Sequence, residues 1–316
     1  MVGAIVLATN QGLGVLAKDF FDNGVIDKVL IKHHSSRENH PEWYGKKGKW
    51  LQPENYEWFF NGLDSVIYFE DPFEWKILIE ARKRGIQNVL CPMFECSRFP
   101  FPYEPDLLLC PSLMEMDLYK GKNTVFAQIP VKEEWKLRKK AKVFVHNAGN
   151  GGLGGRNGTK ELIEAMKYVK SPIKLIIRSQ SLDLKCDDPR VEIRKGQFEH
   201  KDLYNEGDIF IFPEKFNGLS LPIQEAYASG MPIMSTNRYP FNTWLPNELL
   251  IPVKGYKKET IAVEFDSAII DPKDIAETID RWYNKDITKY SLMGKEWGEK
   301  NNWANLKNVY EKYLQK

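Results

Sequence analysis

Short apolar runs alternate with longer amphipathic stretches along almost the whole chain. Apolar runs bounded by turn residues are typical of buried strands, and apolar positions recurring once per helical turn are typical of surface helices. This alternation predicts βα units on a parallel sheet. In the first half we expect strands at residues 3–8, 28–32, 65–69, 88–92 and 106–110, and helices at 15–23 and 73–84.

The second half repeats the alternation. Strands are expected at residues 142–147, 173–177, 191–194, 209–213 and 232–235, and helices at 160–169, 200–205 and 221–229. Three further helices, at 273–283, 287–300 and 303–314, are expected to close the chain. The second half is therefore predicted to form a parallel sheet of its own.

Three stretches interrupt the pattern. Residues 33–61 are polar, rich in Trp and without a clear period, which predicts an irregular surface loop, with an acceptor-binding insertion as the alternative. The stretch SRFPFPYEP, 97–105, is broken by proline and is also predicted to be a loop. The basic run KEEWKLRKKAK, 132–142, predicts a solvated helix or an interdomain linker.

Each half begins with an apolar strand and a glycine turn. We therefore expect an N-terminal Rossmann-like domain over residues 1–138 and a C-terminal one over 139–302, hinged near 132–142. In open α/β sheets ligands bind beyond the carboxyl ends of the strands. A cleft faced by the two sheets is thus the expected binding site.

Composition and charge narrow the function. The chain has 316 residues, of which 42% are hydrophobic and 28% are charged, as in a globular protein of two domains. Its 45 Lys and Arg against 43 Asp and Glu give a formal net charge of +2. That balance provides no general attraction to DNA, RNA or anionic lipid.

Cysteine usage and hydropathy indicate the compartment. The four cysteines include no CxxC pair, so a metal site is not expected. The expected compartment is the reducing cytoplasm. The N-terminal MVGAIVLATNQG lacks a charged leader and a cleavage site, and it predicts a first strand. No apolar run approaches the ~20 residues of a membrane span. We expect a cytoplasmic protein without a transmembrane segment, in at most peripheral contact with a membrane.

A glycine loop follows the first strand of the second half. Gly149, Gly151 and Gly154 have the spacing G-x-G-x-x-G, but no helix opens directly there and no acidic residue follows ~20 positions on, as a dinucleotide site requires. Arg178, at the end of the next strand, could bind a 2′-phosphate. An NADP-dependent oxidoreductase therefore stays open as an alternative.

The same loop could hold a diphosphate. A glycine-rich turn at a helix N-terminus brings backbone N–H groups close to a phosphate. Arg156 and Lys160 in this turn could neutralise its charge, the alternative being a flexible turn with two solvated cations. Gly12, between Asn10 and Gly14, belongs to a smaller version in the first half, where a plain tight βα turn is the alternative.

Residues 208–236 combine a buried strand, a polar turn, a helix starting near Leu221 and a second strand. Pro222 suits the first helical turn, where its missing N–H would be unpaired anyway. Gly218 permits backbone conformations that other residues resist. Glu225, one turn into the helix, can accept two hydrogen bonds from hydroxyl groups such as those of a ribose, and Gly230 suits the end of the helix.

This stretch resembles the nucleotide-sugar site of the GT-B glycosyltransferases of the GT4 type. Their usual pattern is E-G-F-G-L-P-x-x-E-A-x-A-x-G-x-P, and residues 217–232 here are N-G-L-S-L-P-I-Q-E-A-Y-A-S-G-M-P. The segments RNGTKELIEAM and YNEGDIFIFP are also similar to parts of that family. The resemblance implies the GT-B architecture, two Rossmann-like domains with parallel sheets facing a central cleft. The closing helix, about 303–316, resembles the family's terminal helix, which packs back on the first domain.

By that resemblance the C-terminal domain binds the donor. Glu225 would bind its ribose, and the backbone at Gly218, Leu219 and Ser220 would contact its sugar and phosphates. The implied reaction is a metal-independent transfer with retention, without a cofactor, from a donor such as UDP-glucose or a GDP-sugar. The acceptor, a glycan, a lipid-linked sugar or a protein, would be bound by the N-terminal domain.

Two departures from the family pattern affect the donor site. The family's lysine before the glycine corresponds to Asn157, so the cationic role passes to Arg156, Lys160 or Arg178. The family's first glutamate is Asn217 here, which can bind a sugar hydroxyl but carries no charge. A catalytically weak sugar-nucleotide-binding protein is therefore a second alternative, and a GT-B-shaped epimerase is a third.

The first domain should supply a polar residue near the reacting sugar. Where the family often has a histidine, this chain has Met93, so Glu95 is the candidate, with an exposed loop carboxylate as the alternative. Glu70 and Asp71, after the strand at 65–69, are further candidates. His146 is expected to be a structural histidine bonded to a backbone group.

Overall fold

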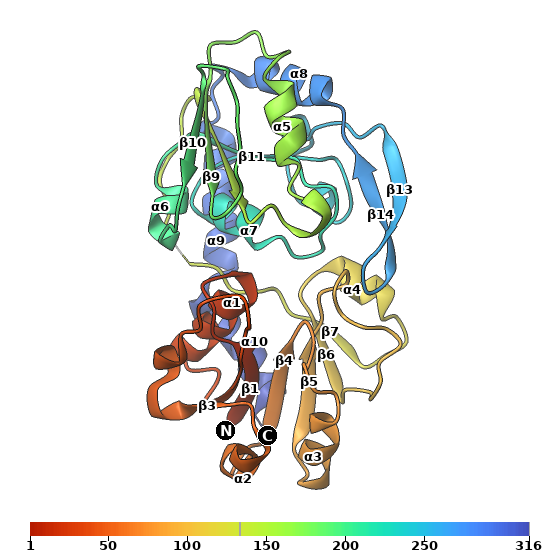
Figure 1. Ribbon diagram of the computed structural model, residues 1–316. Helices are drawn as coiled ribbons and strands as arrows, with labels where there is room; N and C mark the ends of the chain where they lie inside the picture. Colours follow the sequence, from red (N-terminus) through yellow and green to blue (C-terminus); the bar gives the residue numbers. More distant parts are fainter. Residues whose placement is uncertain (133, 316) are drawn as a thin grey trace. The chain divides into compact units, whose positions relative to one another are not determined.

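The computed structural model describes residues 1–132 and 134–315. They form an α/β structure that divides into two compact units (Figure 1). The first unit comprises residues 1–130, 260–264 and the chain from 303 onward, and the second unit comprises 131–259 and 265–302. Glu133, in the expected hinge, and Lys316, in the expected closing helix, lie outside the described residues.

The first unit contains a seven-stranded sheet in the order β3-β2-β1-β4-β5-β6-β7, and every neighbouring pair is parallel. Most of its apolar strand residues, other than those of the edge strand β7, are almost fully buried, as in a sheet covered on both faces. The order is that of a Rossmann sheet with one added strand. The strands are β1 (Val2–Leu7), β2 (Lys28–Lys32), β3 (Gly48–Trp50), β4 (Ser65–Phe69), β5 (Gln87–Cys91), β6 (Leu107–Cys110) and β7 (Thr124–Phe126).

The last helix of the chain belongs to the core of the first unit. The ring of Phe20 lies edge-on to Trp303 and Tyr310, with centroids 5.0 and 4.7 Å away. The Ser65 hydroxyl donates a hydrogen bond to the carbonyl of Leu314 at 2.6 Å. The helices of this unit are α1 (Gly12–Asp22), α2 (Tyr56–Phe60), α3 (Ile77–Lys83), α4 (Leu113–Leu118) and α10 (Trp303–Leu314), with 3₁₀ segments η1 (Pro41–Lys47) and η2 (Pro53–Asn55).

The second unit contains a five-stranded parallel sheet in the order β10-β9-β8-β11-β12, again a Rossmann order, and a separate two-stranded sheet. The strands of the larger sheet are β8 (Val143–Gly149), β9 (Lys174–Ser179), β10 (Val191–Lys195), β11 (Ile209–Phe212) and β12 (Ile233–Ser235). The two-stranded sheet consists of β13 (Gly255–Thr260) and β14 (Glu264–Ile269). The helices are α5 (Thr159–Ala165), α6 (His200–Tyr204), α7 (Leu221–Ala228), α8 (Pro272–Trp282) and α9 (Thr288–Lys300), with 3₁₀ segments η3 (Leu153–Gly155), η4 (Phe241–Thr243) and η5 (Asn247–Leu249).

Alternating strand residues of this sheet enter two different cores. In β11, Ile209 and Ile211 pack with residues of α5 and α8, whereas Phe210 and Phe212 pack with residues of α6 and α7. Side chains alternate between the two faces of a strand, so this division places a helical layer on each face. Continuous apolar runs in the sequence follow from that two-sided burial.

Several expectations were incomplete or wrong. Residues 33–61 are not one irregular loop, because β3 within them pairs with β2 and α2 supplies Phe59 and Phe60 to the core. The expected helix at 73–84 begins only at Ile77, since Asp71 accepts hydrogen bonds from Phe73 N–H and Trp75 Nε1 and so forms a turn. The polar strands β13 and β14, and α4 and β7, were not predicted.

The basic run at 132–142 contains no helix among its described residues. Arg138 is buried in the second unit, where it donates hydrogen bonds to the carbonyls of Tyr204, Gly207 and Lys136 at 2.8–2.9 Å. The prediction of a solvated helix was therefore wrong. No helix in the described part of the chain has the length and apolar character needed to cross a bilayer.

One glycine controls how the glycine loop meets β11. Gly158 caps α5 with a φ of +68°, and a Cβ atom there would lie 2.0 Å from the carbonyl oxygen of Pro213. Gly155 has the same φ of +68° but nothing within 4 Å of its Cβ position. Alanine substitution at Gly155 therefore measures the free-energy cost of the left-handed backbone alone. Substitution at Gly158 adds the cost of the contact with Pro213.

We expect Gly155→Ala to lower the free energy of unfolding by about 1 kcal/mol, the cost of the left-handed conformation. Gly158→Ala should cost on the order of 3 kcal/mol, because the added methyl group also displaces the Pro213 carbonyl. Denaturant unfolding of both variants beside the wild type checks this. Equal losses would show that the approach of Pro213 to Gly158 does not constrain the structure.

Candidate functional site

The loop between β11 and α7, residues 213–220, lies at the carboxyl edge of the second unit's sheet. α7 begins at Leu221 with Pro222 in its first turn, as predicted. Ser220, the residue before the helix, has a φ of +43°, in the left-handed region that non-glycine residues rarely adopt. A strained residue is retained only where its surroundings fix it.

Asn217 organises the loop from within. Its Oδ1 atom accepts hydrogen bonds from the N–H groups of Leu219 and Ser220, both at 3.1 Å. Its Nδ2 atom donates to Oε1 of Glu214 at 2.9 Å. The amide is 6% exposed. The N–H groups of Leu219 and Ser220, predicted to contact a donor, are thus engaged inside the loop.

Glu214 and Arg238 form a buried charge pair beside Asn217. Oε2 of Glu214 lies 3.1 Å from Nη2 of Arg238, and the two side chains are 1% and 3% exposed. Arg238 also donates through Nε to the Glu214 carbonyl at 3.1 Å and through Nη1 to the Asn217 carbonyl at 2.9 Å. Burial raises the pKa of Glu214, against the opposing effects of the Arg238 and Arg156 cations and of Asn217.

The glycine loop joins this site through Arg156. Its carbonyl accepts a hydrogen bond from Lys215 N–H at 2.7 Å, and its half-buried side chain is close enough to lower the pKa of Glu214. Lys215 Nζ pairs with Oε1 of Glu161 in α5 at 2.8 Å. Lys160, in the first turn of α5, is exposed. The structure therefore brings Arg156 to the loop of residues 213–220 and leaves Lys160 at the surface of α5.

Glu225, in α7, contacts two residues of α6. The Tyr204 hydroxyl donates a hydrogen bond to Oε2 at 2.7 Å, and Nε2 of His200 lies 3.6 Å from Oε1. Burial lowers the pKa of His200, but Glu225, with Glu134 beyond it, outweighs burial and the Lys132 cation, so the pKa is raised overall. The Glu225 side chain keeps 20% of its surface exposed. It can therefore still reach a ligand.

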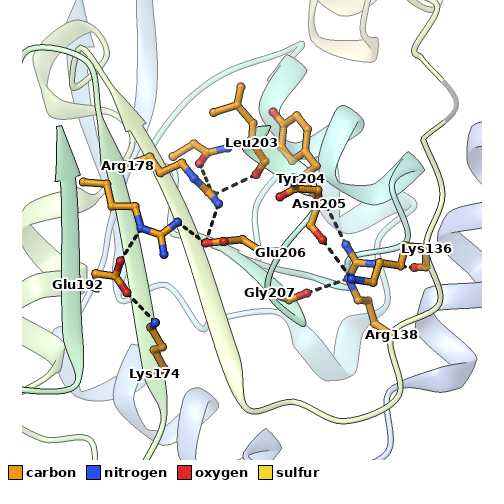
Figure 2. A network of polar contacts seen from close by, with 12 residues as sticks. Lys136, Arg138, Lys174, Arg178, Glu192, Leu203, Tyr204, Asn205, Glu206 and Gly207 are labelled. Atoms are coloured by element: carbon orange, nitrogen blue, oxygen red, sulfur yellow. Dashed lines mark hydrogen bonds and ion pairs between the residues drawn. The ribbon is translucent and has the colours of Figure 1, made fainter. Parts of the chain in front are cut away.

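Arg178 lies in a separate network (Figure 2). Its Nη1 donates to the Leu203 carbonyl at 3.1 Å, and its Nη2 lies 3.0 Å from Oε1 of Glu206, which also pairs with Arg194. The Arg178 side chain is 2% exposed, and burial lowers its pKa against the effect of Glu206. A 2′-phosphate would have to displace these partners, so the NADP alternative is not favoured. The role of Arg178 in donor binding stays a prediction.

His146 is a structural histidine. Its Nδ1 lies 2.9 Å from the Ile211 carbonyl and its Nε2 lies 2.8 Å from the Thr159 hydroxyl. Burial lowers its pKa to about 4, with the Ile211 hydrogen bond acting in the opposite direction. The ring is therefore neutral at pH 7 and ties β8, β11 and the start of α5 together.

In the first unit, Glu95 follows β5 and is only 3% exposed, so the alternative of an exposed loop carboxylate is wrong. Beside it, Glu115 accepts hydrogen bonds from Phe94 N–H at 3.0 Å and from the Ser112 hydroxyl. Burial raises the pKa of Glu115 to about 7, and the Glu95 carboxylate adds to that effect. Two buried carboxyl groups thus neighbour each other after β5 and β6.

The remaining first-unit candidates occupy turns. Gly12 lies exposed in the first turn of α1, with open space around its Cβ position. The Glu70 carbonyl accepts a hydrogen bond from the Ser97 hydroxyl at 2.6 Å. Asp71 shapes the turn before α3. Within residues 1–132 and 134–315, no three His, Cys, Asp or Glu side chains are placed to hold a metal ion.

Sequence reasoning missed the partners of the predicted residues. Glu214 and Arg238 are separated by 24 positions, and Tyr204 and Glu225 by 21. Glu214 could have been found, because it is a charged residue that directly follows the predicted apolar strand at 209–213. Arg238, in an ordinary turn after β12, offered no such signal.

No family model matches the chain, and none of the curated proteins matches it. Solved structures do. HepE of Anabaena, in complex with UDP and glucose, is similar with a TM-score of 0.67 and 11% identity, over 99% of this chain and 98% of HepE. The lipopolysaccharide outer core galactosyltransferase WaaB, in its apo form, is similar with a TM-score of 0.62 and 14% identity, over 98% of each chain.

The pneumococcal O-GlcNAc transferase GtfA, in complex with UDP and GlcNAc, is similar with a TM-score of 0.57 and 12% identity. The match covers 80% of this chain but only 57% of GtfA. At such identities the likeness shows the fold alone. The chain has the α/β fold of GT-B glycosyltransferases, with the two parallel sheets that the sequence predicted.

The buried carboxyl group of Glu115 generates a pH prediction. Its folded pKa of about 7 exceeds the ordinary value of 4.5, so the folded state holds this proton more tightly than the unfolded state does. That contribution to stability is present below the unfolded pKa and is lost as pH rises toward 7. The free energy of unfolding of Glu115→Gln, relative to that of the wild type, should therefore increase by on the order of 1–3 kcal/mol between pH 4.5 and pH 8.

Unfolding measured at both pH values, with the exposed Glu54→Gln as the control, checks this. A Glu115→Gln difference that does not change with pH would show that Glu115 titrates normally.

Proposed function

We propose that the chain is a glycosyltransferase of the GT4 type, which moves a sugar from a nucleotide-diphosphate sugar to an acceptor. The observation that carries the proposal is the loop of residues 213–220 with Glu225 one turn behind it, at the carboxyl edge of a Rossmann-like sheet. Ligands of open α/β sheets bind at that edge. In this proposal residues 139–302 bind the donor and residues 1–138, with the last helix, bind the acceptor.

The nucleotide end of the donor is assigned to Glu225. The hydrogen bond from Tyr204 orients its carboxylate, and Nε2 of His200 lies 3.6 Å from the other carboxylate oxygen. An ionised carboxylate can accept both vicinal hydroxyls of a ribose. UDP is the proposed nucleotide, because HepE and GtfA were both solved with UDP.

The leaving group is assigned to the glycine loop. Arg156, with Lys160 at the next turn, would offset the charge that develops on the diphosphate, and no metal is needed in this proposal. The bond from the anomeric carbon to the phosphate oxygen breaks with its electron pair on that oxygen. The acceptor hydroxyl oxygen bonds to the anomeric carbon with retention, and its proton passes to the departing diphosphate.

The sugar end is assigned to the loop itself and to the first unit. Gly218, Leu219 and Ser220 would border the sugar through their backbone, with Asn217 holding them in shape. Glu95 is the proposed first-unit residue near the reacting sugar. The acceptor is proposed to be a glycan, a lipid-linked sugar or a protein. A cytoplasmic location is part of the proposal, supported by four cysteines that form no disulfide.

Replacing Glu225 by Gln tests the nucleotide assignment. A neutral amide keeps the shape but weakens charge-assisted hydrogen bonds to a ribose, so the dissociation constant for UDP should rise by about 10-fold. Titration calorimetry with UDP measures it. Glu277→Gln, an exposed position in α8, should leave UDP binding unchanged. Wild-type affinity in Glu225→Gln would reject the assignment of Glu225.

Replacing Arg156 by Met tests the leaving-group assignment. Loss of one cation at the departing diphosphate should lower kcat by about 10²-fold, while UDP binding changes less. UDP release from UDP-glucose, UDP-galactose and UDP-GlcNAc measures turnover. Lys167→Met, an exposed lysine in the turn after α5, serves as the matched control. If the wild type binds UDP but releases none from any donor, the protein is a sugar-nucleotide-binding protein instead.

A further inference from the structure

The hydrogen bonds of Asn217 can be made only by an amide. Its Oδ1 accepts from two backbone N–H groups, while its Nδ2 donates to Oε1 of Glu214 at 2.9 Å. A carboxylate at position 217 could accept the same two N–H groups, but it has no hydrogen to donate. It would instead place a second negative charge against Glu214, at a site where both side chains are almost fully buried.

Glu214 is in turn held by Arg238. The guanidinium reaches Oε2 of Glu214, the carbonyl of Glu214 and the carbonyl of Asn217 at 2.9–3.1 Å. The Thr236 hydroxyl donates a second hydrogen bond to the Glu214 carbonyl at 2.5 Å. The backbone at both 214 and 217 is therefore fixed by the residues that directly follow β12. Because Arg238 is 3% exposed and these bonds engage its Nε, Nη1 and Nη2 atoms, its effect on a ligand passes through the loop.

We propose that Glu214, Asn217 and Arg238 act as one positioning unit for the sugar-binding loop, in which the carboxylate that the resemblance places at 217 is supplied from 214. The proposal rests on the proposed function for the identity of the ligand. In this positioning unit the amide of Asn217 has a role that a glutamate at position 217 could not have. Asn217 is the residue that the carboxylate of Glu214 requires.

The unit has a specific electrostatic balance. One buried carboxylate faces one buried guanidinium, the neutral amide of Asn217 donates to the other carboxylate oxygen, and the Arg156 cation lies close enough to act on Glu214. Removing one partner of such a pair leaves an uncompensated buried charge, which is strongly destabilising. Moving the charge within the unit, while keeping one carboxylate and one amide, should be tolerated far better.

An exchange of the two side-chain types tests this. Asn217→Asp adds a second carboxylate, and Glu214→Gln leaves Arg238 without its ionic partner. The double variant Glu214→Gln/Asn217→Asp keeps the charge count and reverses the hydrogen bond, with the Gln amide donating to the Asp carboxylate. Asn205→Asp, an exposed position elsewhere in the second structural unit, controls for an added charge.

We expect each single variant to lower Tm by on the order of 5 °C and to raise KM for a UDP-sugar by about 10-fold. UDP lacks the sugar and should bind all variants with wild-type affinity, a split that a general loss of structure would not produce. The double variant should recover Tm to near the wild-type value and KM to within about twofold of it, because it keeps one carboxylate and the hydrogen bond between positions 214 and 217. Asn205→Asp should match the wild type.

Three outcomes decide the proposal, with UDP and UDP-glucose as the probes. Wild-type Tm and KM in Asn217→Asp would overturn it, and so would a double variant no better than Asn217→Asp. If the wild type binds neither UDP nor UDP-glucose, the proposed function fails. Coupled loss and recovery of Tm would in that case still support the positioning unit, because Tm is measured without a ligand.

Discussion

A carboxylate and a guanidinium that are both withdrawn from water must satisfy each other, because neither can be buried alone at acceptable cost. Glu214 and Arg238 meet that condition in the second unit, and the loop before α7 depends on it. Their contacts fix the backbone of Glu214 and Asn217, and Asn217 then fixes the N–H groups of Leu219 and Ser220. The left-handed conformation of Ser220 is thus retained by its neighbours.

The polar groups near the carboxyl edge of the second unit's sheet divide by exposure. Arg178 and Arg238 are almost fully buried, and their hydrogen bonds join elements of the protein. Glu225 and Arg156 keep part of their surface exposed. A group that already satisfies internal partners gains little by binding a ligand, since it must first lose those partners. In the proposed site, ligand contact is therefore assigned to the partly exposed Glu225 and Arg156, and the buried arginines hold the surrounding backbone in place.

Much of the fold could be predicted from the sequence, and the reason is local. Two-sided burial gives β8, β9 and β11 continuous apolar runs, and these were placed within two residues. β13 and β14 are polar strands and carry no such run. In the candidate site, Glu225 and residues 217–220 follow from one contiguous pattern. Arg238 could not be found that way, because its pairing with Glu214 spans 24 positions and exists only in the folded chain.

The same contrast explains how an α/β fold can be shared at 11–14% identity. Burial of a strand requires only apolar residues at alternating or continuous positions, and many different sequences meet that requirement. A buried charge imposes a stricter condition, because a carboxylate can move along a loop only if its neighbours change with it. An acid at 214 excludes an acid at 217 and favours an amide there. In the proposed positioning unit, Asn217 is thus the residue that accommodates the buried carboxylate of Glu214.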